Sequence, residues 1–131
     1  MKLVLDEPGS KEARKTVKNL LKEGFSLYTV DIALAESLNA VWKHVIIHGN
    51  LKMEEAESAI RDLTRIYDAI GVLATRELTR EAVEIALTEN ITVYDSVYIA
   101  AAKKLKATMI TADRKLYNAS KGLVSALIIQ E

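Results

Sequence analysis

The chain has 131 residues, of which half are hydrophobic, and its 18 basic and 18 acidic side chains give a net charge of zero. This composition is typical of one ordinary globular domain, and the charge balance excludes a protein that coats nucleic acid by bulk electrostatics. The absence of cysteine excludes disulfides, thiolate zinc sites and a cysteine nucleophile.

No apolar run approaches the length that spans a bilayer, and no basic-then-apolar leader opens the sequence. We therefore expect a cytoplasmic protein without a membrane partner. A single proline and five separated glycines leave no linker, repeat or low-complexity tract. The sequence predicts one domain over residues 1–131.

Apolar periodicity predicts strands and helices in alternation. A short apolar strand over residues 1–5 leads through the turn at 7–10 into a helix over residues 10–23, with Gly24 as its C-cap. The later elements, in chain order, are a strand at 25–30, helices at 31–50 and 52–67, a strand at 70–74, helices at 79–87 and 95–105, a strand at 107–111, a helix at 113–119 and a strand at 123–129. Alternating strands and helices indicate an α/β fold with helices on both faces of a mostly parallel sheet, which is a three-layer α/β/α arrangement.

Acidic residues fall where the predicted strands end or the following helices begin. Asp6 ends the first strand, Asp95 opens a helix, and Asp113 stands two residues beyond a strand. Glu36 lies in the second turn of the helix that follows the second strand. Because function gathers at the carboxyl ends of parallel strands, we expect these four acids to meet at one edge of the sheet.

Each acid also has a structural explanation. Asp95 and Asp113 could be helix N-caps, as could Asp31, and Asp6 could be a turn residue. Glu36 is harder to explain in this way, because it is flanked by Leu34 and Leu38 on or beside an apolar stripe, where an unpaired carboxylate is costly to bury.

Clustered carboxylates repel one another unless a cation lies between them. Oxygen-only ligation suits Mg²⁺ or Mn²⁺, and such a site can activate water and stabilise the charge that develops on a phosphate. The acids therefore indicate metal-assisted hydrolysis of phosphodiesters. Arg114 and Lys115, beside Asp113, are candidate phosphate contacts.

At these acids the sequence resembles the PIN-domain proteins, in particular the VapC ribonuclease toxins of prokaryotic toxin–antitoxin pairs. The resemblance spans nearly the whole chain and is carried by residues 31–40, 93–102 and 105–116. It implies that Glu36, Asp95 and Asp113 are acids of the metal site. It further implies that Thr111 supplies a supporting hydroxyl and that Asn39 is a polar neighbour of Glu36.

The same resemblance implies an RNA substrate, a homodimer and a small VapB-type antitoxin whose segment fills the acidic cleft.

The start of the chain departs from the family pattern, because residues 1–10 are too short for both the first strand and the short helical segment that usually follows it. Either Asp6 ends the first strand and is its metal acid, or that strand and its aspartate are missing. We favour the first alternative, since a sheet without its central strand would expose unpaired edges.

Two alternatives remain. The first is a zinc site at His44 and His48, which lie four residues apart on one helix, a spacing that can bind zinc. The sequence offers no obvious third ligand, and two histidines near the end of a helix also complement its dipole. The second alternative is a catalytically impaired PIN-like module that acts through dimerisation or through binding an antitoxin or RNA. Trp42, Ile46 and Ile47 offer apolar surface for such contacts.

Overall fold

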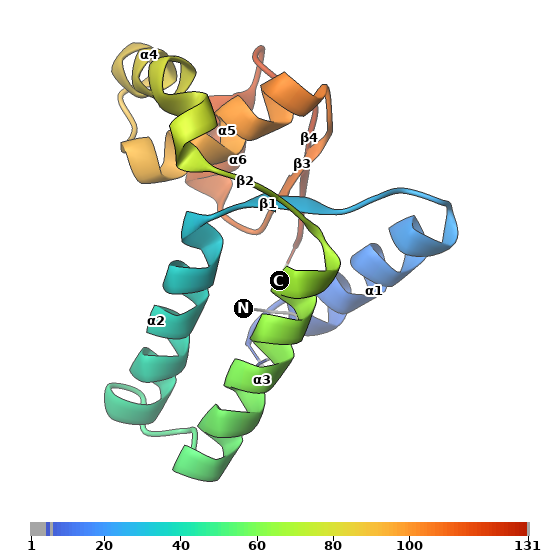
Figure 1. Ribbon diagram of the computed structural model, residues 1–131, viewed down its shortest axis with the longest axis vertical. Helices are drawn as coiled ribbons and strands as arrows, with labels where there is room; N and C mark the ends of the chain where they lie inside the picture. The colour runs from blue at the N-terminus through green and yellow to red at the C-terminus, as the bar shows by residue number, and fades with distance from the viewer. Residues whose placement is uncertain (1–4, 6, 131) are drawn as a thin grey trace. The chain divides into compact units, whose positions relative to one another are not determined.

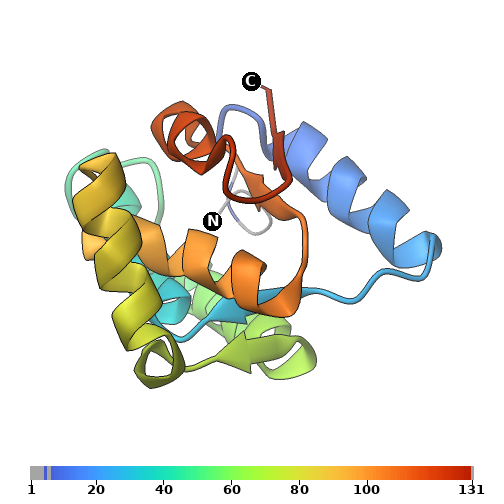
Figure 2. The same cartoon turned by 90° about the horizontal axis from the view of Figure 1, so that it is seen from above.

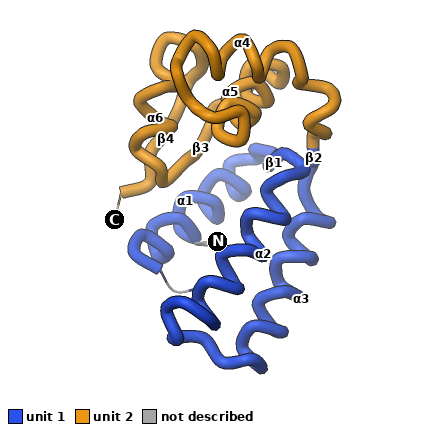
Figure 3. Tube along the Cα trace, turned by 90° about the vertical axis from the view of Figure 1, so that its left-hand side faces the viewer, with its two compact units in different colours: residues 1–72 blue, residues 73–131 orange. Residues whose placement is uncertain are grey.

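The computed structural model describes residue 5 and residues 7–130, which form two compact units, Met1–Val72 and Leu73–Glu131 (Figures 1 and 3). The predicted strand over residues 1–5 lies almost wholly outside the described residues. Its last residue, Leu5, occupies a bend and is buried.

The first unit is built around a helical hairpin. Helix α2 (Ile32–Ile46) runs beside helix α3 (Met53–Ala69) in Figure 1, after helix α1 (Ser10–Lys22) and strand β1 (Tyr28–Val30). The hairpin core consists of Leu5, Val41, Ala56, Ala59 and Leu63, with Val45 and Leu51 packed against it. Small alanines on α3 allow the two helices to approach closely.

Helix ends in this unit follow local chemistry. Gly24 lies just beyond α1 with φ +91°, a conformation that glycine adopts without steric cost, as expected for a residue that ends a helix. At the start of α3, the Glu55 carboxylate accepts the backbone N–H of Lys52 at 2.9 Å, which satisfies a donor that the helix itself leaves unpaired.

The strand β1 pairs with β2 (Gly71–Leu73), which spans the boundary between the units. The Gly71 N–H donates to the Leu27 carbonyl at 3.1 Å. A β-carbon at Gly71 would collide with the Tyr28 ring, so only glycine lets that ring lie over the neighbouring strand.

The second unit contains the 3₁₀ helix η1 (Thr75–Leu78) and the remaining elements, namely α4 (Thr79–Glu89), α5 (Val93–Leu105), β3 (Met109–Thr111), α6 (Arg114–Ser120) and β4 (Ala126–Ile128). Strands β3 and β4 are parallel, with Met109 opposite Ala126 and Thr111 opposite Ile128. Figure 2 shows α4 beside α5, and both α5 and α6 contact β3. This parallel pair flanked by helices is the predicted α/β pattern.

Helix α5 is the most deeply buried element of the second unit. Ser96, Val97, Ile99 and the three alanines that follow are all buried. The Lys106 backbone ends the helix in a left-handed conformation.

Several predicted boundaries were wrong. The strands are shorter than predicted, since each described strand has three residues. The apolar residues on either side lie outside the strands, although their β-propensity favoured longer ones. Helix α5 begins at Val93, two residues before Asp95. On α2, only Val41 is buried, and Trp42 is 51% exposed. In residue 5 and residues 7–130, every helix is too short or too polar to span a bilayer.

Candidate functional site

Asp95 occupies the first turn of α5 but does not cap it. The cap is Thr92, whose Oγ1 accepts the backbone N–H of Asp95 at 3.2 Å. The suggestion that Asp95 is merely an N-cap is therefore wrong. Asp95 itself is partly buried in this first turn.

Asp113, by contrast, is a true N-cap. Its Oδ1 accepts the backbone N–H groups of Lys115 at 2.9 Å and Leu116 at 3.2 Å at the start of α6. The Thr111 hydroxyl in turn accepts the Asp113 N–H at 3.0 Å. Both capping bonds go to Oδ1, so the cap itself does not use the second carboxylate oxygen. Thr111 thus fixes the backbone at Asp113, and α6 fixes the orientation of its carboxylate.

The two basic candidates lie in the first turn of α6. Arg114 and Lys115 are both exposed. Arg114 Nη2 lies 3.4 Å from Gln130 Oε1, a weak contact for an exposed pair. Both cations remain accessible to an anionic ligand.

Glu36 lies on α2, in the first unit, with Asn39 three residues further along the same helix. Both side chains are exposed. The prediction that Glu36 is costly to bury is therefore wrong. Flanking leucines alone do not bury a helical residue, since residues one and two positions apart face different directions. The case for Glu36 rests on its resemblance to the family motif.

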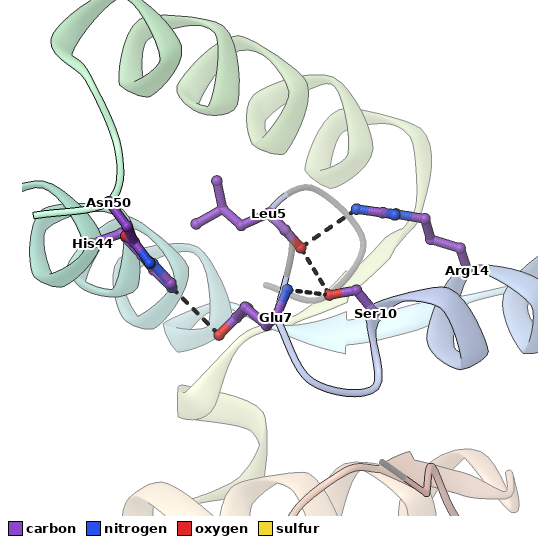
Figure 4. Close-up of polar contacts among 6 residues, drawn as sticks. All are labelled: Leu5, Glu7, Ser10, Arg14, His44 and Asn50. Atoms are coloured by element: carbon purple, nitrogen blue, oxygen red, sulfur yellow. Dashed lines mark hydrogen bonds and ion pairs between the residues drawn. The ribbon is translucent and has the colours of Figure 1, made fainter. Parts of the chain in front are cut away.

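Asp6 lies outside the described residues, but its two neighbours are held by specific contacts (Figure 4). The Leu5 carbonyl accepts the Ser10 hydroxyl at 2.8 Å and Arg14 Nη2 at 3.4 Å. Ser10 Oγ also accepts the Glu7 N–H at 2.8 Å. The sequence pointed to neither Ser10 nor Arg14, because contacts with a carbonyl five and nine residues away leave no signal in local periodicity.

His44 makes two polar contacts of its own. Its Nδ1 lies 2.9 Å from Asn50 Oδ1, and its Nε2 lies 3.5 Å from Glu7 Oε2 (Figure 4). The His48 ring stacks edge-on at 5.2 Å between centroids. Zinc binding at this pair would have to displace both contacts of His44.

The described part of the chain, residue 5 and residues 7–130, holds no group of three His, Cys, Asp or Glu side chains close enough to bind one metal ion. Glu36 belongs to the first unit and Asp95 and Asp113 to the second. The second unit contributes hard carboxylate oxygens, and Mg²⁺ is often bound by only one or two carboxylates together with waters. The donor chemistry of Asp95 and Asp113 therefore fits such an ion.

An open hollow in the second unit lies elsewhere, among η1, α4 and α5. Glu81 and Lys103 line it and form an ion pair at 3.0 Å between Oε1 and Nζ. Neither Asp95 nor Asp113 borders this hollow, so it is a separate feature from the candidate acids.

Comparison with known proteins places the chain in a family. The model of the PIN domain matches residues 1–122. The chain is 30% identical to Ribonuclease VapC3 of Pyrobaculum aerophilum over an alignment of 131 residues that covers 95% of this chain and 99% of the relative. The crystal structure of PAE2754 from Pyrobaculum aerophilum is similar with a TM-score of 0.59 and 25% sequence identity, over 73% of this chain and 68% of that one. The chain therefore belongs to the PIN-domain family and has its α/β fold.

Proposed function

We propose that this PIN-domain protein is a metal-dependent endoribonuclease that hydrolyses RNA phosphodiester bonds as the toxin of a toxin–antitoxin pair. The observation that carries the proposal is the similarity to a protein named Ribonuclease VapC3 along essentially the full length of both chains. The position of Asp95 supports it, because Thr92 performs the capping of α5 and leaves the acid available for another role.

The proposed metal ligands are the carboxylates of Asp6, Glu36, Asp95 and Asp113. Their oxygens suit Mg²⁺ or Mn²⁺, whereas a chain without cysteine has no thiolates for softer metals. When bound, the ion would activate water and offset the negative charge of the reacting phosphate. The protein's own contribution is to orient the acids, which Thr92 does for the Asp95 backbone and α6 for the Asp113 carboxylate.

Four further residues complete the proposed site. Thr111 supports Asp113 through the hydrogen bond to its backbone, and Asn39 is the proposed polar neighbour of Glu36. Arg114 and Lys115 would contact RNA phosphates, since exposed cations beside an acidic metal site attract the substrate backbone.

We also propose that residues 1–131 act as a single PIN domain. The family model extends over residues 1–122 and so crosses the boundary after Val72. We further propose that this RNA-cleaving enzyme works in the cytoplasm.

The proposed partners are a second copy of the chain and a VapB-type antitoxin. The VapC name of the relative supports an antitoxin. Exposed apolar side chains on and just after α2, namely Trp42, Ile46 and Ile47, support protein–protein contact in general.

Removal of the metal tests the activity. Incubation with end-labelled RNA should yield cleavage with Mg²⁺ or Mn²⁺, and excess EDTA should reduce it to the buffer background. Re-addition of Mg²⁺ beyond the EDTA should restore cleavage, which controls for irreversible loss of protein. Cleavage that persists in EDTA would contradict the metal requirement, and no cleavage with either metal would favour the catalytically impaired module.

Substitutions at Asp113 should separate its two roles. Asp113→Asn retains a good N-cap and loses the charge, so stability should change little while Mg²⁺-dependent cleavage falls. Asp113→Ala should lose cleavage and in addition about 1 kcal/mol of stability. Urea unfolding and cleavage rates measure the two effects. Equal cleavage by the wild type and Asp113→Asn would remove Asp113 from the site.

A further inference from the structure

Ser96 is a fully buried polar residue that no part of the proposed chemistry uses. It is 0% exposed and directly follows Asp95 on α5. Its hydroxyl donates to the Ala82 carbonyl of α4 at 2.7 Å, and the Val93 carbonyl, one turn back on its own helix, lies at 3.0 Å. One hydroxyl proton serves one acceptor best, and the shorter contact is the one that links the two helices.

The position of this contact matters because it lies in the first turn of α5. The N–H groups of a first turn have no partners within the helix, so that turn frays unless something else holds it. Two side chains hold it here. Thr92 Oγ1 binds the Asp95 N–H at 3.2 Å, and Ser96 ties the same turn to α4.

Packing alone does not require a serine at this position. The rest of the buried face of α5 is apolar, with Val97 and Ile99 followed by three alanines. An alanine would nearly match serine in volume, and burying a hydroxyl is unfavourable unless it forms a hydrogen bond. What serine adds is therefore a directional link to one carbonyl of α4.

We propose that Ser96 is a positioning residue for Asp95, in that it fixes the first turn of α5 against α4 and so fixes where the Asp95 carboxylate stands. This inference rests on the proposed function, in which Asp95 binds Mg²⁺ or Mn²⁺. Mg²⁺ demands near-ideal octahedral geometry, whereas Ca²⁺ accepts irregular coordination at longer distances. A displaced carboxylate should therefore weaken Mg²⁺ binding more than Ca²⁺ binding.

The test uses Ser96→Ala with Ser120→Ala as its matched control. Ser120 is also 0% exposed, and its hydroxyl donates to the Tyr117 carbonyl at 2.6 Å, but that bond stays within the far end of α6. Calorimetric titration of the whole protein should show Mg²⁺ binding about tenfold weaker in Ser96→Ala, the size of effect seen when groups that orient metal ligands are removed. Ca²⁺ binding should weaken less, and Ser120→Ala should bind both ions as the wild type does.

Cleavage kinetics provide a second readout. Ser96→Ala should lower kcat at a fixed Mg²⁺ concentration with little change in the KM for RNA, and saturating Mg²⁺ should recover part of the loss. If Ser96→Ala does not fold, Ser96→Cys keeps the size and a weak donor, and should show the same selective loss of Mg²⁺ affinity to a smaller degree.

The possible failures are distinguishable. If the wild type binds Mg²⁺ and Ser96→Ala binds it equally well, then Ser96 is structural only and the proposed function stands. The same conclusion follows if Ser96→Ala loses no more Mg²⁺ and Ca²⁺ affinity than Ser120→Ala does. If the wild type itself binds neither Mg²⁺ nor Mn²⁺, the proposed function fails and the role of Ser96 fails with it.

Discussion

Asp95→Asn should reduce metal-dependent RNA cleavage by about 100-fold or more while leaving the fold intact. The substitution exchanges a charged ligand for a neutral amide of the same shape, and the lost stabilisation of several kcal/mol corresponds to at least two powers of ten in rate. The cap of α5 should survive, because Thr92 binds the backbone N–H of residue 95 and not its side chain. Single-turnover cleavage of end-labelled RNA in Mg²⁺ measures the effect.

The matched control is Asp62→Asn on α3. Asp62 is an exposed acid whose contact with Arg65, at 3.9 Å, is a surface ion pair of little energetic weight. Its removal should leave cleavage and thermal stability unchanged. Equal activity of Asp95→Asn and Asp62→Asn would eliminate Asp95 as a metal ligand and with it the principal support for the site.

Ile99→Ala should have the largest effect on stability among the substitutions considered. Ile99 is 0% exposed and belongs to the largest fully buried side chains of the described residues. Its truncation on α5 removes buried methyl and methylene groups and leaves a cavity, at a cost of about 2–5 kcal/mol. Urea unfolding followed by circular dichroism measures the change in the free energy of unfolding.

Leu87→Ala on α4 controls for the loss of a large side chain from a helix. Leu87 is 79% exposed, so this change should alter stability by no more than about 0.5 kcal/mol. Ile99→Val should fall between the two, at about 1 kcal/mol. A cost for Ile99→Ala as small as that of Leu87→Ala would contradict the burial of α5.

Local chemistry predicted part of the backbone geometry around the candidate acids. Asp113 stands between a strand and a helix, and capping preferences alone identified it as a possible N-cap. The resemblance of residues 93–102 to a family motif pointed to Asp95. Neither approach identified Thr92 as the residue that caps α5, although a threonine three residues before an aspartate resembles a known capping pattern.

Exposure was predicted less well than secondary structure. The leucines beside Glu36 suggested a buried acid, yet Glu36 is exposed. Trp42, which was expected to offer apolar surface, is 51% exposed. Periodicity reports which residues share a helix face. It does not report how much of that face another element covers, because coverage depends on contacts between segments distant in sequence.

By itself, the sequence determined the α/β class and, from residue 7 to residue 130, the order of the α-helices and strands and the approximate ends of most helices, because these follow from periodicity and capping within a few residues. It missed the 3₁₀ helix η1. Only the tertiary structure decided that Ser96 binds the Ala82 carbonyl, that Ser10 binds the Leu5 carbonyl and that His44 faces Glu7. Each of these contacts depends on the directions in which separate segments pack, and hydrogen bonds form only within a few tenths of an ångström of ideal geometry. No local pattern fixes that geometry.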